Sequence, residues 1–185
     1  MNDLILSKLD AGKSSLGITP NAHGGGIPAA CLSTSVDKVG GVIQTTILVD
    51  LGQGAGSGGG ANDIIGTDNT TDAGGAYIAY LTKEVNGVPF IVELSCIETP
   101  TGGDPDVNVV TGSASTDVHD AAVTGANVCV NGGDQADGAH AQGDPGDTVT
   151  DGAIALPYVY LTTGDATDAA YTAGKLVITI YGANF

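Results

Sequence analysis

The chain has 185 residues, enough to bury a core as one domain. Its formal net charge is −16, and all five of its basic residues are lysines, so it lacks the clustered cations with which proteins bind nucleic acids and anionic membranes. With 42% hydrophobic residues, the chain is too apolar to stay disordered despite this charge. We therefore expect a folded protein that binds neither nucleic acid nor membrane.

Glycine and aspartate are unusually frequent. The chain contains 30 glycines, and 18 of its 21 acidic residues are Asp rather than Glu. Aspartate hydrogen-bonds to nearby backbone in turns and caps, whereas glutamate favours helices. We interpret the glycines as markers of turns and place the negative charge on loops.

Residues 1–41 are expected to form an extended arm, followed by a β domain at 42–185. The segment "SSLGITPNAHGGGIPAA" has glycine and proline too closely spaced for long elements. A strand is then predicted at 42–51, where residues that suit a strand recur at every second position: Ile43, Thr45, Ile47, Val49 and Leu51.

The segment 76–100 combines two β-rich runs around Asn86-Gly87, a pair that favours the tight turn of a β-hairpin. We therefore predict a hairpin there. One face of its second strand should be buried and carry Phe90, Val92, Leu94 and Cys96.

Further strands are predicted at 107–112, 126–132, 156–164 and 174–182. In the last of them Leu176, Ile178 and Ile180 alternate with Val177, Thr179 and Tyr181. Short strands separated by Gly/Asp/Pro loops, without a sustained helical period, predict an all-β sandwich or jelly roll.

The cysteines bear on disulfide and metal sites, and the beginning of the chain bears on where the protein is made. Cys31, Cys96 and Cys129 lack Cys-x-x-Cys spacing, so neither a disulfide framework nor a zinc site is predicted. Cys96 and Cys129 lie in apolar runs and are expected to be buried. The chain begins without a basic segment followed by a long apolar stretch, so we expect it to be made in the cytoplasm.

Two segments resemble parts of known motifs, one phosphate-binding and one catalytic, but each lacks a residue that its motif requires. Gly12-Lys13-Ser14 resembles the end of a phosphate-binding loop, but the first glycine of that motif would fall at Ser7. His119-Asp120 lies near Ser113 and Ser115 without the G-x-S-x-G elbow of a serine hydrolase. The sequence therefore predicts a protein that is not an enzyme.

The acidic loop "NGGDQADGAHAQGDPGD" at 131–147 offers four candidate metal ligands: Asp134, Asp137, Asp144 and Asp147. Their spacing fits neither an EF-hand nor a calcium β-roll, so a solvated loop is favoured over a Ca²⁺ site. Asp104, Asp106 and the pair Asp144 and Asp147 could also gather in the fold, which the sequence leaves open. No cofactor is predicted, and Ca²⁺ is the ion that these oxygens would suit.

Three segments carry a resemblance to a known family. They are "LPYVYLTTGDATDAAYTAGKLVITIYGANF", "ANDIIGT" and "GGAYIAYLTKEVNGVPFIVELSCIETPTGG". Residues of about 40–185 resemble virion structural proteins of marine tailed bacteriophages, which are encoded near the major capsid protein. The clearest pieces are Tyr-Leu-Thr-x-Gly, Tyr-Thr-Ala-Gly-Lys and the terminal Tyr-Gly.

The resemblance implies a capsid decoration, or cement, protein assembled in the host cytoplasm. Such a β-sandwich would bind the major capsid protein on the outer surface of the head, in many copies and often as a trimer, with no catalytic residues to transfer. The apolar arm at 1–41 would be its docking element.

Two alternatives stay open. An adhesive or receptor-binding virion β module would depend on Ca²⁺ and bind glycans. A phage-associated hydrolase would use an acidic site that includes Asp144 or Asp147.

Overall fold

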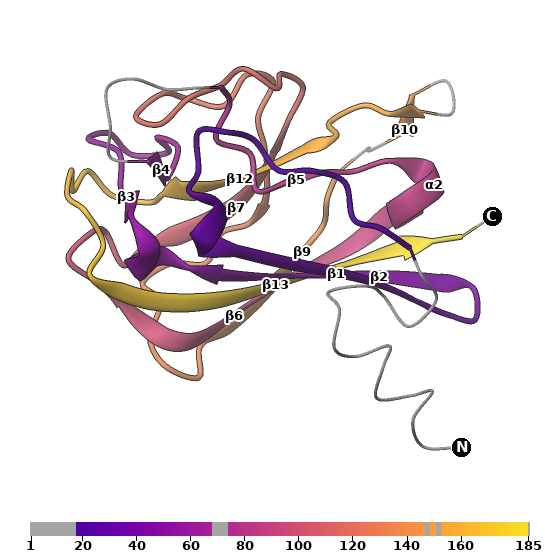
Figure 1. The fold of residues 1–185 in the computed structure, drawn as a ribbon, viewed down its shortest axis with the longest axis horizontal. Coiled ribbons are helices and arrows are strands. Elements are labelled where there is room, and N and C mark those ends of the chain that lie inside the picture. Colours follow the sequence, from indigo (N-terminus) through magenta and orange to yellow (C-terminus); the bar gives the residue numbers. More distant parts are fainter. Residues whose placement is uncertain (1–17, 68–73, 147–148, 151–152, 185) are drawn as a thin grey trace.

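The computed structural model describes residues 18–67, 74–146, 149–150 and 153–184, and it is built mostly from antiparallel strands. Two sheets pack together as a sandwich (Figure 1). The first has five strands in the order β1 (Leu32–Val39), β2 (Val42–Asp50), β13 (Ala173–Ala183), β6 (Val88–Thr101) and β9 (His140–Gly143). The second has four, in the order β5 (Ala79–Tyr80), β12 (Tyr158–Thr163), β7 (Val107–Gly112) and β8 (Asn127–Val130).

Shorter elements complete the described part. Two-residue strands pair as β3 (Ala55–Gly56) with β4 (Gly66–Thr67), and as β10 (Val149–Thr150) with β11 (Ala153–Ile154). The helices in this part are single turns: η1 (Ala29–Cys31), η2 (Leu51–Gln53) and α2 (Lys83–Asn86). None of them is long and apolar enough to cross a membrane.

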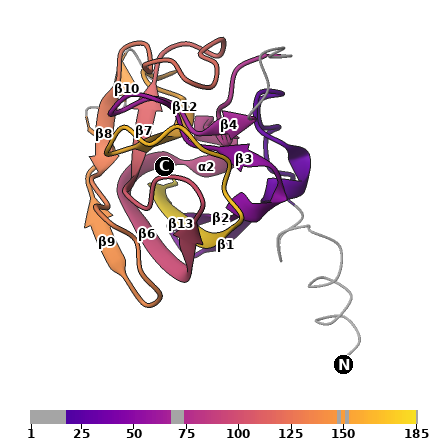
Figure 2. The ribbon, with the colours of Figure 1, turned by 90° about the vertical axis from the view of Figure 1, so that its left-hand side faces the viewer.

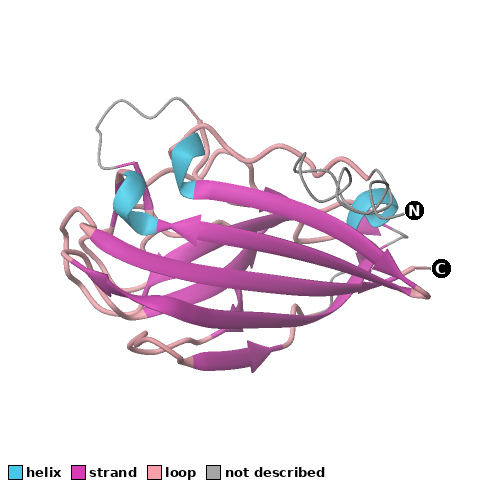
Figure 3. Ribbon diagram, turned by 60° about the horizontal axis from the view of Figure 1, so that its bottom comes forward, coloured by secondary structure: helices cyan, strands magenta, loops and turns pink. Residues whose placement is uncertain are grey.

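The core lies between the two sheets and follows the alternation of the strands. In β2 the side chains of Ile43, Thr45, Ile47 and Val49 are buried while their neighbours point outward. The same pattern holds for Leu176, Ile178 and Ile180 in β13 and for Val92, Leu94 and Cys96 in β6. Figure 3 shows the strands of the five-stranded sheet side by side. The prediction of a sandwich-like all-β domain is confirmed.

Phe90 departs from the predicted buried face of β6, because 44% of it is exposed. The register between β6 and β13 shifts next to it, between the pairs Tyr181↔Ile91 and Gly182↔Pro89. Such an irregularity interrupts the alternation of side chains, so the apolar period cannot be extended through this point.

The predicted hairpin at Asn86-Gly87 is wrong. β5 pairs with β12 in the four-stranded sheet, whereas β6 pairs with β13 in the other sheet. Between them Thr82 caps α2 by accepting a hydrogen bond from the N–H of Val85, and Gly87 ends the turn with φ of 71°. Asn86 is buried, and its amide donates to the hydroxyl of Thr45 at 2.8 Å. Asn-Gly therefore joins two sheets here.

The predicted arm is corrected for the part that the structure describes. Residues 32–39 form β1, which pairs with β2 along its whole length from Leu32↔Val49 to Val39↔Val42. Ile27, Cys31 and Val36 are buried. A two-residue turn joins β1 to β2, so residues up to 39 belong to the domain. Residues 1–17 lie outside the described part.

The cysteines are buried and free, as predicted for Cys96 and Cys129. Burial raises the pKa of the Cys31 thiol to about 11. A thiol that stays protonated at neutral pH is a poor nucleophile, so these residues serve as small core side chains.

Candidate cation site

Three loops meet at one end of the four-stranded sheet. Because β7 runs antiparallel to both β12 and β8, the start of β7 lies beside the ends of the other two strands, as the pairs Thr163↔Val107 and Val109↔Val130 show. An aspartate stands in each loop: Asp106 before β7, Asp134 after β8 and Asp165 after β12.

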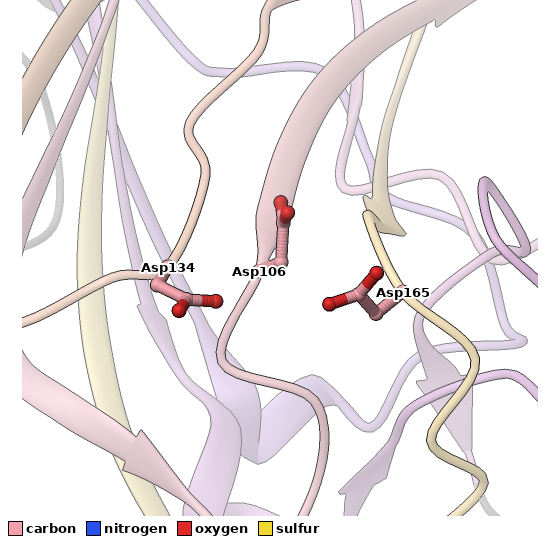
Figure 4. A group of neighbouring side chains, drawn as sticks. All are labelled: Asp106, Asp134 and Asp165. Atoms are coloured by element: carbon pink, nitrogen blue, oxygen red, sulfur yellow. The ribbon is translucent and has the colours of Figure 1, made fainter.

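The carboxylates of these three residues form the acidic cluster. Each offers one oxygen, and these oxygens lie within 4.8 Å of one another. Figure 4 shows the carboxylates of Asp134 and Asp165 pointing inward from opposite sides of Asp106. Asp106 and Asp134 are also joined by an isolated antiparallel bridge, so backbone pairing holds two of the loops together.

Asp104 organises the backbone of the cluster. This residue is buried, and its carboxylate accepts hydrogen bonds from the N–H groups of Asp106 at 3.0 Å and Asp165 at 2.9 Å. Its carbonyl accepts a hydrogen bond from the hydroxyl of Tyr171 at 2.7 Å. Asp104 thus fixes two of the three loops, which limits how far the clustered carboxylates can move apart.

Gly164 allows the close approach of β12 to Asp106. Its N–H donates to the carbonyl of Asp106 at 2.8 Å. A Cβ at position 164 would lie 2.0 Å from the carboxyl carbon of Asp106, closer than non-bonded atoms approach. Any larger residue would push the carboxylate out of its place.

Asp106 is the least well solvated member of the cluster. Its Oδ1 atom is buried without a hydrogen-bond partner among the described residues. Burial raises the pKa of Asp106 above its ordinary value, and the three neighbouring carboxylates raise it further. The charge of this side chain is therefore unfavourable in the folded protein.

The arrangement can lower this electrostatic cost in two ways. Asp106 can hold a proton, or a divalent cation can bind between the carboxylates. Ca²⁺ takes six to eight oxygens, of which the cluster would supply part and backbone carbonyls or water the remainder. The chemistry of the donor set fits a hard cation such as Ca²⁺ and not a soft metal.

The variant Asp106→Asn is expected to be more stable than the wild type at pH 7 in EDTA. The folded-state pKa of Asp106 is raised, so its charge destabilises the fold at pH values above that pKa. The penalty fades as the pH falls through the raised folded-state pKa, and it is gone below the ordinary pKa of Asp, where the folded and unfolded chains are both protonated. Thermal unfolding at pH 7 and at about pH 3 measures the difference.

Asp137→Asn is the matched control, because it removes the same charge from an exposed position outside the cluster. It should change the melting temperature less at pH 7. An Asp106→Asn protein that is less stable than the wild type at pH 7 would show that the carboxylate makes a favourable contact instead.

The four candidates of the acidic loop divide as follows. Asp134 joins the cluster. Asp137 is exposed, with its N–H donating to the hydroxyl of Thr99 at 2.9 Å. Asp144 accepts a hydrogen bond from the N–H of Gly146 at 2.8 Å, which closes a local turn, and Asp147 lies outside the described residues. Neither Asp137 nor Asp144 belongs to the acidic cluster.

Two members of the cluster come from elsewhere in the sequence. The sequence leaves open whether Asp106 gathers with Asp144 and Asp147, and it does not single out Asp165. Its only signal is its place directly after a predicted strand, which becomes informative once β12 is known to pair with β7.

The serine and histidine that resemble part of a serine hydrolase site contact other residues. The hydroxyl of Ser113 donates to the carbonyl of Thr124 at 3.2 Å, and the ring of His119 contacts the carbonyl of Ser57 through Nε2 at 3.3 Å. The residues of the imitated phosphate loop lie outside the described part.

Comparisons of the chain with models of protein families, with curated proteins and with solved structures find no match.

Proposed function

We propose that this chain is a capsid decoration protein of a tailed bacteriophage, which binds the major capsid protein on the outside of the head and has no enzymatic activity. The resemblance of residues of about 40–185 to virion proteins motivates the proposal. The observation that carries it is the order of the strands, which suits a fold that virion proteins use repeatedly.

The strand order supports a jelly roll. Eight strands, taken along the chain, are β2, β5, β6, β7, β8, β9, β12 and β13. One sheet then holds the first, eighth, third and sixth of them, and the other holds the second, seventh, fourth and fifth. This is the alternation expected of two interlocked Greek keys, the topology of many viral capsid and lectin domains. β1 adds a strand beside the first.

The outer face of the five-stranded sheet suits contact with a partner. Apolar side chains are exposed on it and at its β1–β2 turn: Val39 is 73% and Leu48 37% exposed. Their neighbours across the strands are mostly small or uncharged, among them Ser33 and Val177 beside Leu48. Val39 lies opposite Val42 and Leu48 opposite Ser33, so exposed apolar side chains stand toward both ends of the β1–β2 pair, and a partner that packs along this pair would cover both.

Charge on this face is partly compensated. Lys175 forms an ion pair with Glu98 and lies 4.0 Å from Asp50, while the hydroxyl of Tyr181 donates to Glu93 at 3.2 Å. In a chain with a net charge of −16, such a face opposes association less than the acidic loops would. A decoration protein would present those loops to solvent.

Cosedimentation with mature heads of the phage that encodes the chain tests the proposal. The wild type is expected to pellet with the heads in a fixed stoichiometry. Leu48→Glu should weaken binding more than tenfold, because it would bury an unpaired charge at the contact. Thr116→Glu adds the same charge to an exposed loop beyond the other sheet and should bind like the wild type.

Wild-type protein that stays in the supernatant would overturn the capsid proposal. Equal loss of binding in both glutamate variants would mean that net charge, and not the five-stranded face, controls the contact. Cryo-electron microscopy of the pellet would further show whether the bound chain is a trimer.

A calcium-dependent adhesive module is the second candidate, favoured by the acidic cluster. It predicts that millimolar CaCl₂ raises the melting temperature by several degrees and that EDTA reverses the change. Asp165→Asn should abolish this response, while Asp137→Asn keeps it. A wild type that melts at the same temperature in CaCl₂ and EDTA would exclude a calcium-stabilised module.

A further inference from the structure

A second, smaller core lies on the outer face of the four-stranded sheet. Its buried members are Ile64, Ala76, Val110, Val123 and Tyr160. Two loops, 57–65 and 113–126, cover it and are tied together. The N–H of Ile64 donates to the carbonyl of Ala121 at 3.0 Å, and the N–H of Asp120 donates back to the carbonyl of Ile64 at 3.2 Å.

This cover is incomplete toward β8. There a hollow of about 290 Å³ opens between the sheet and the loops, which we name the β7–β8 hollow. Its apolar walls come from Val110, Val123, Val128, Ala122 and Ala126. Val128 is 49% exposed although it stands directly opposite the buried Val110 on the neighbouring strand. The hollow therefore leaves part of an apolar face uncovered.

One wall of the hollow is polar. Thr162 lines it and is only 1% exposed, yet its hydroxyl has no hydrogen-bond partner within the described residues. Its neighbours in β12 behave otherwise: the Tyr160 hydroxyl donates to the carbonyl of Ala114 at 2.6 Å, and that of Thr163 donates to the carbonyl of Gly60 at 2.8 Å. A buried hydroxyl without a partner is costly unless something else pairs with it.

Size and charge restrict what could bind. An apolar cavity of about 150 Å³ suffices for benzene, and drug-sized ligands occupy about 300 Å³ or more, so this hollow suits a single ring with a small substituent. None of the residues that line it is charged, whereas the chain as a whole is strongly acidic. A neutral ligand is favoured, and an anion is disfavoured.

We propose that the β7–β8 hollow binds a small neutral organic compound with one apolar ring and one hydroxyl group, the chemistry of a phenol. The ring would lie against the valine and alanine side chains and cover Val128. The hydroxyl would pair with that of Thr162. This site lies on the sheet opposite the proposed capsid-binding face, so the proposal of a ligand site is independent of the proposed function.

Titration of the ¹⁵N-labelled full chain with p-cresol, and separately with toluene, tests the proposal. Both compounds should shift the amide signals of residues around Val110 and Val128. Thr162→Val removes the hydroxyl at nearly constant volume. It should weaken p-cresol binding about fivefold and leave toluene binding unchanged, as expected for one hydrogen bond.

Ala126→Leu gives a second, independent variant, because it places a larger side chain at the exposed rim and should weaken the binding of both compounds. Absence of saturable shifts with wild-type protein would overturn the site. Shifts that persist equally in Thr162→Val would overturn the role of the hydroxyl, and shifts centred elsewhere would overturn the location.

Discussion

Gly143→Ala is expected to destabilise the protein by more than about 3 kcal/mol, because it forces a methyl group into a backbone contact. Gly143 lies in β9 opposite Val92, at the edge of the sandwich where β8 of the other sheet comes close (Figure 2). A Cβ at this position would lie 1.6 Å from the carbonyl oxygen of Cys129 and 2.8 Å from its carbon. Backbone atoms of two strands would have to separate. The midpoint of urea unfolding measures the loss.

Gly41→Ala is the control for this prediction. A Cβ at Gly41 would meet no heavy atom within 4 Å, and its φ lies outside the left-handed region. The substitution only restricts the unfolded chain, so the stability should stay the same or rise by up to about 1 kcal/mol. If both variants unfolded at the urea concentration of the wild type, the close approach of β8 and β9 would be refuted.

This contrast shows where the interpretation of glycine as a turn residue holds and where it fails. Gly40, with φ of 62°, sits at the β1–β2 turn as that interpretation predicts. Gly182 lies inside β13, where a Cβ would come within 1.9 Å of the carbonyl oxygen of Asn86. Composition cannot separate the two cases, because the atoms that Gly182 must avoid are about a hundred residues away in sequence.

The strands could be predicted where apolar and polar residues alternate along the sequence, or where the residues of both faces are apolar. The predicted strand at 107–112 coincides with β7, whose residues are buried throughout between the main core and the smaller outer core. The period-two pattern likewise located β2 and β13 within one or two residues of their ends. Their pairing with each other could not be predicted, because it joins segments more than a hundred residues apart.

The acidic cluster illustrates the same limit. The sequence marks the 131–147 loop as acidic, but among the described residues of that loop only Asp134 enters the cluster. Asp106 and Asp165 reach it because β7 lies between β8 and β12 in the sheet. The spacing of residues along the chain can predict a site whose ligands come from one loop. It says very little about a site whose ligands come from the ends of three strands.

Deletion of residues 1–41 is expected to leave a chain that does not fold. It removes β1, which covers one edge of β2 along eight residue pairs, and the buried side chains of Ile27, Cys31 and Val36. Burial of each large apolar side chain contributes about 1.5–3 kcal/mol, and a domain of this kind is stable by about 5–15 kcal/mol in all. Loss of the cooperative thermal transition in circular dichroism would confirm the expectation.

Deletion of residues 1–17 is the informative counterpart, because it keeps every contact among the described residues. This shorter deletion should retain a cooperative transition, which can be compared directly with that of the full chain. A deletion of 1–41 that still melts cooperatively would contradict the place of β1 in the sheet.

If the deletion of 1–41 leaves the chain unfolded as expected, its failure to bind heads says nothing about docking. Only the deletion of 1–17 tests docking without removing β1. If the shortened protein is folded but no longer pellets with heads, docking is assigned to the first seventeen residues. If it still pellets, docking is assigned to the sandwich.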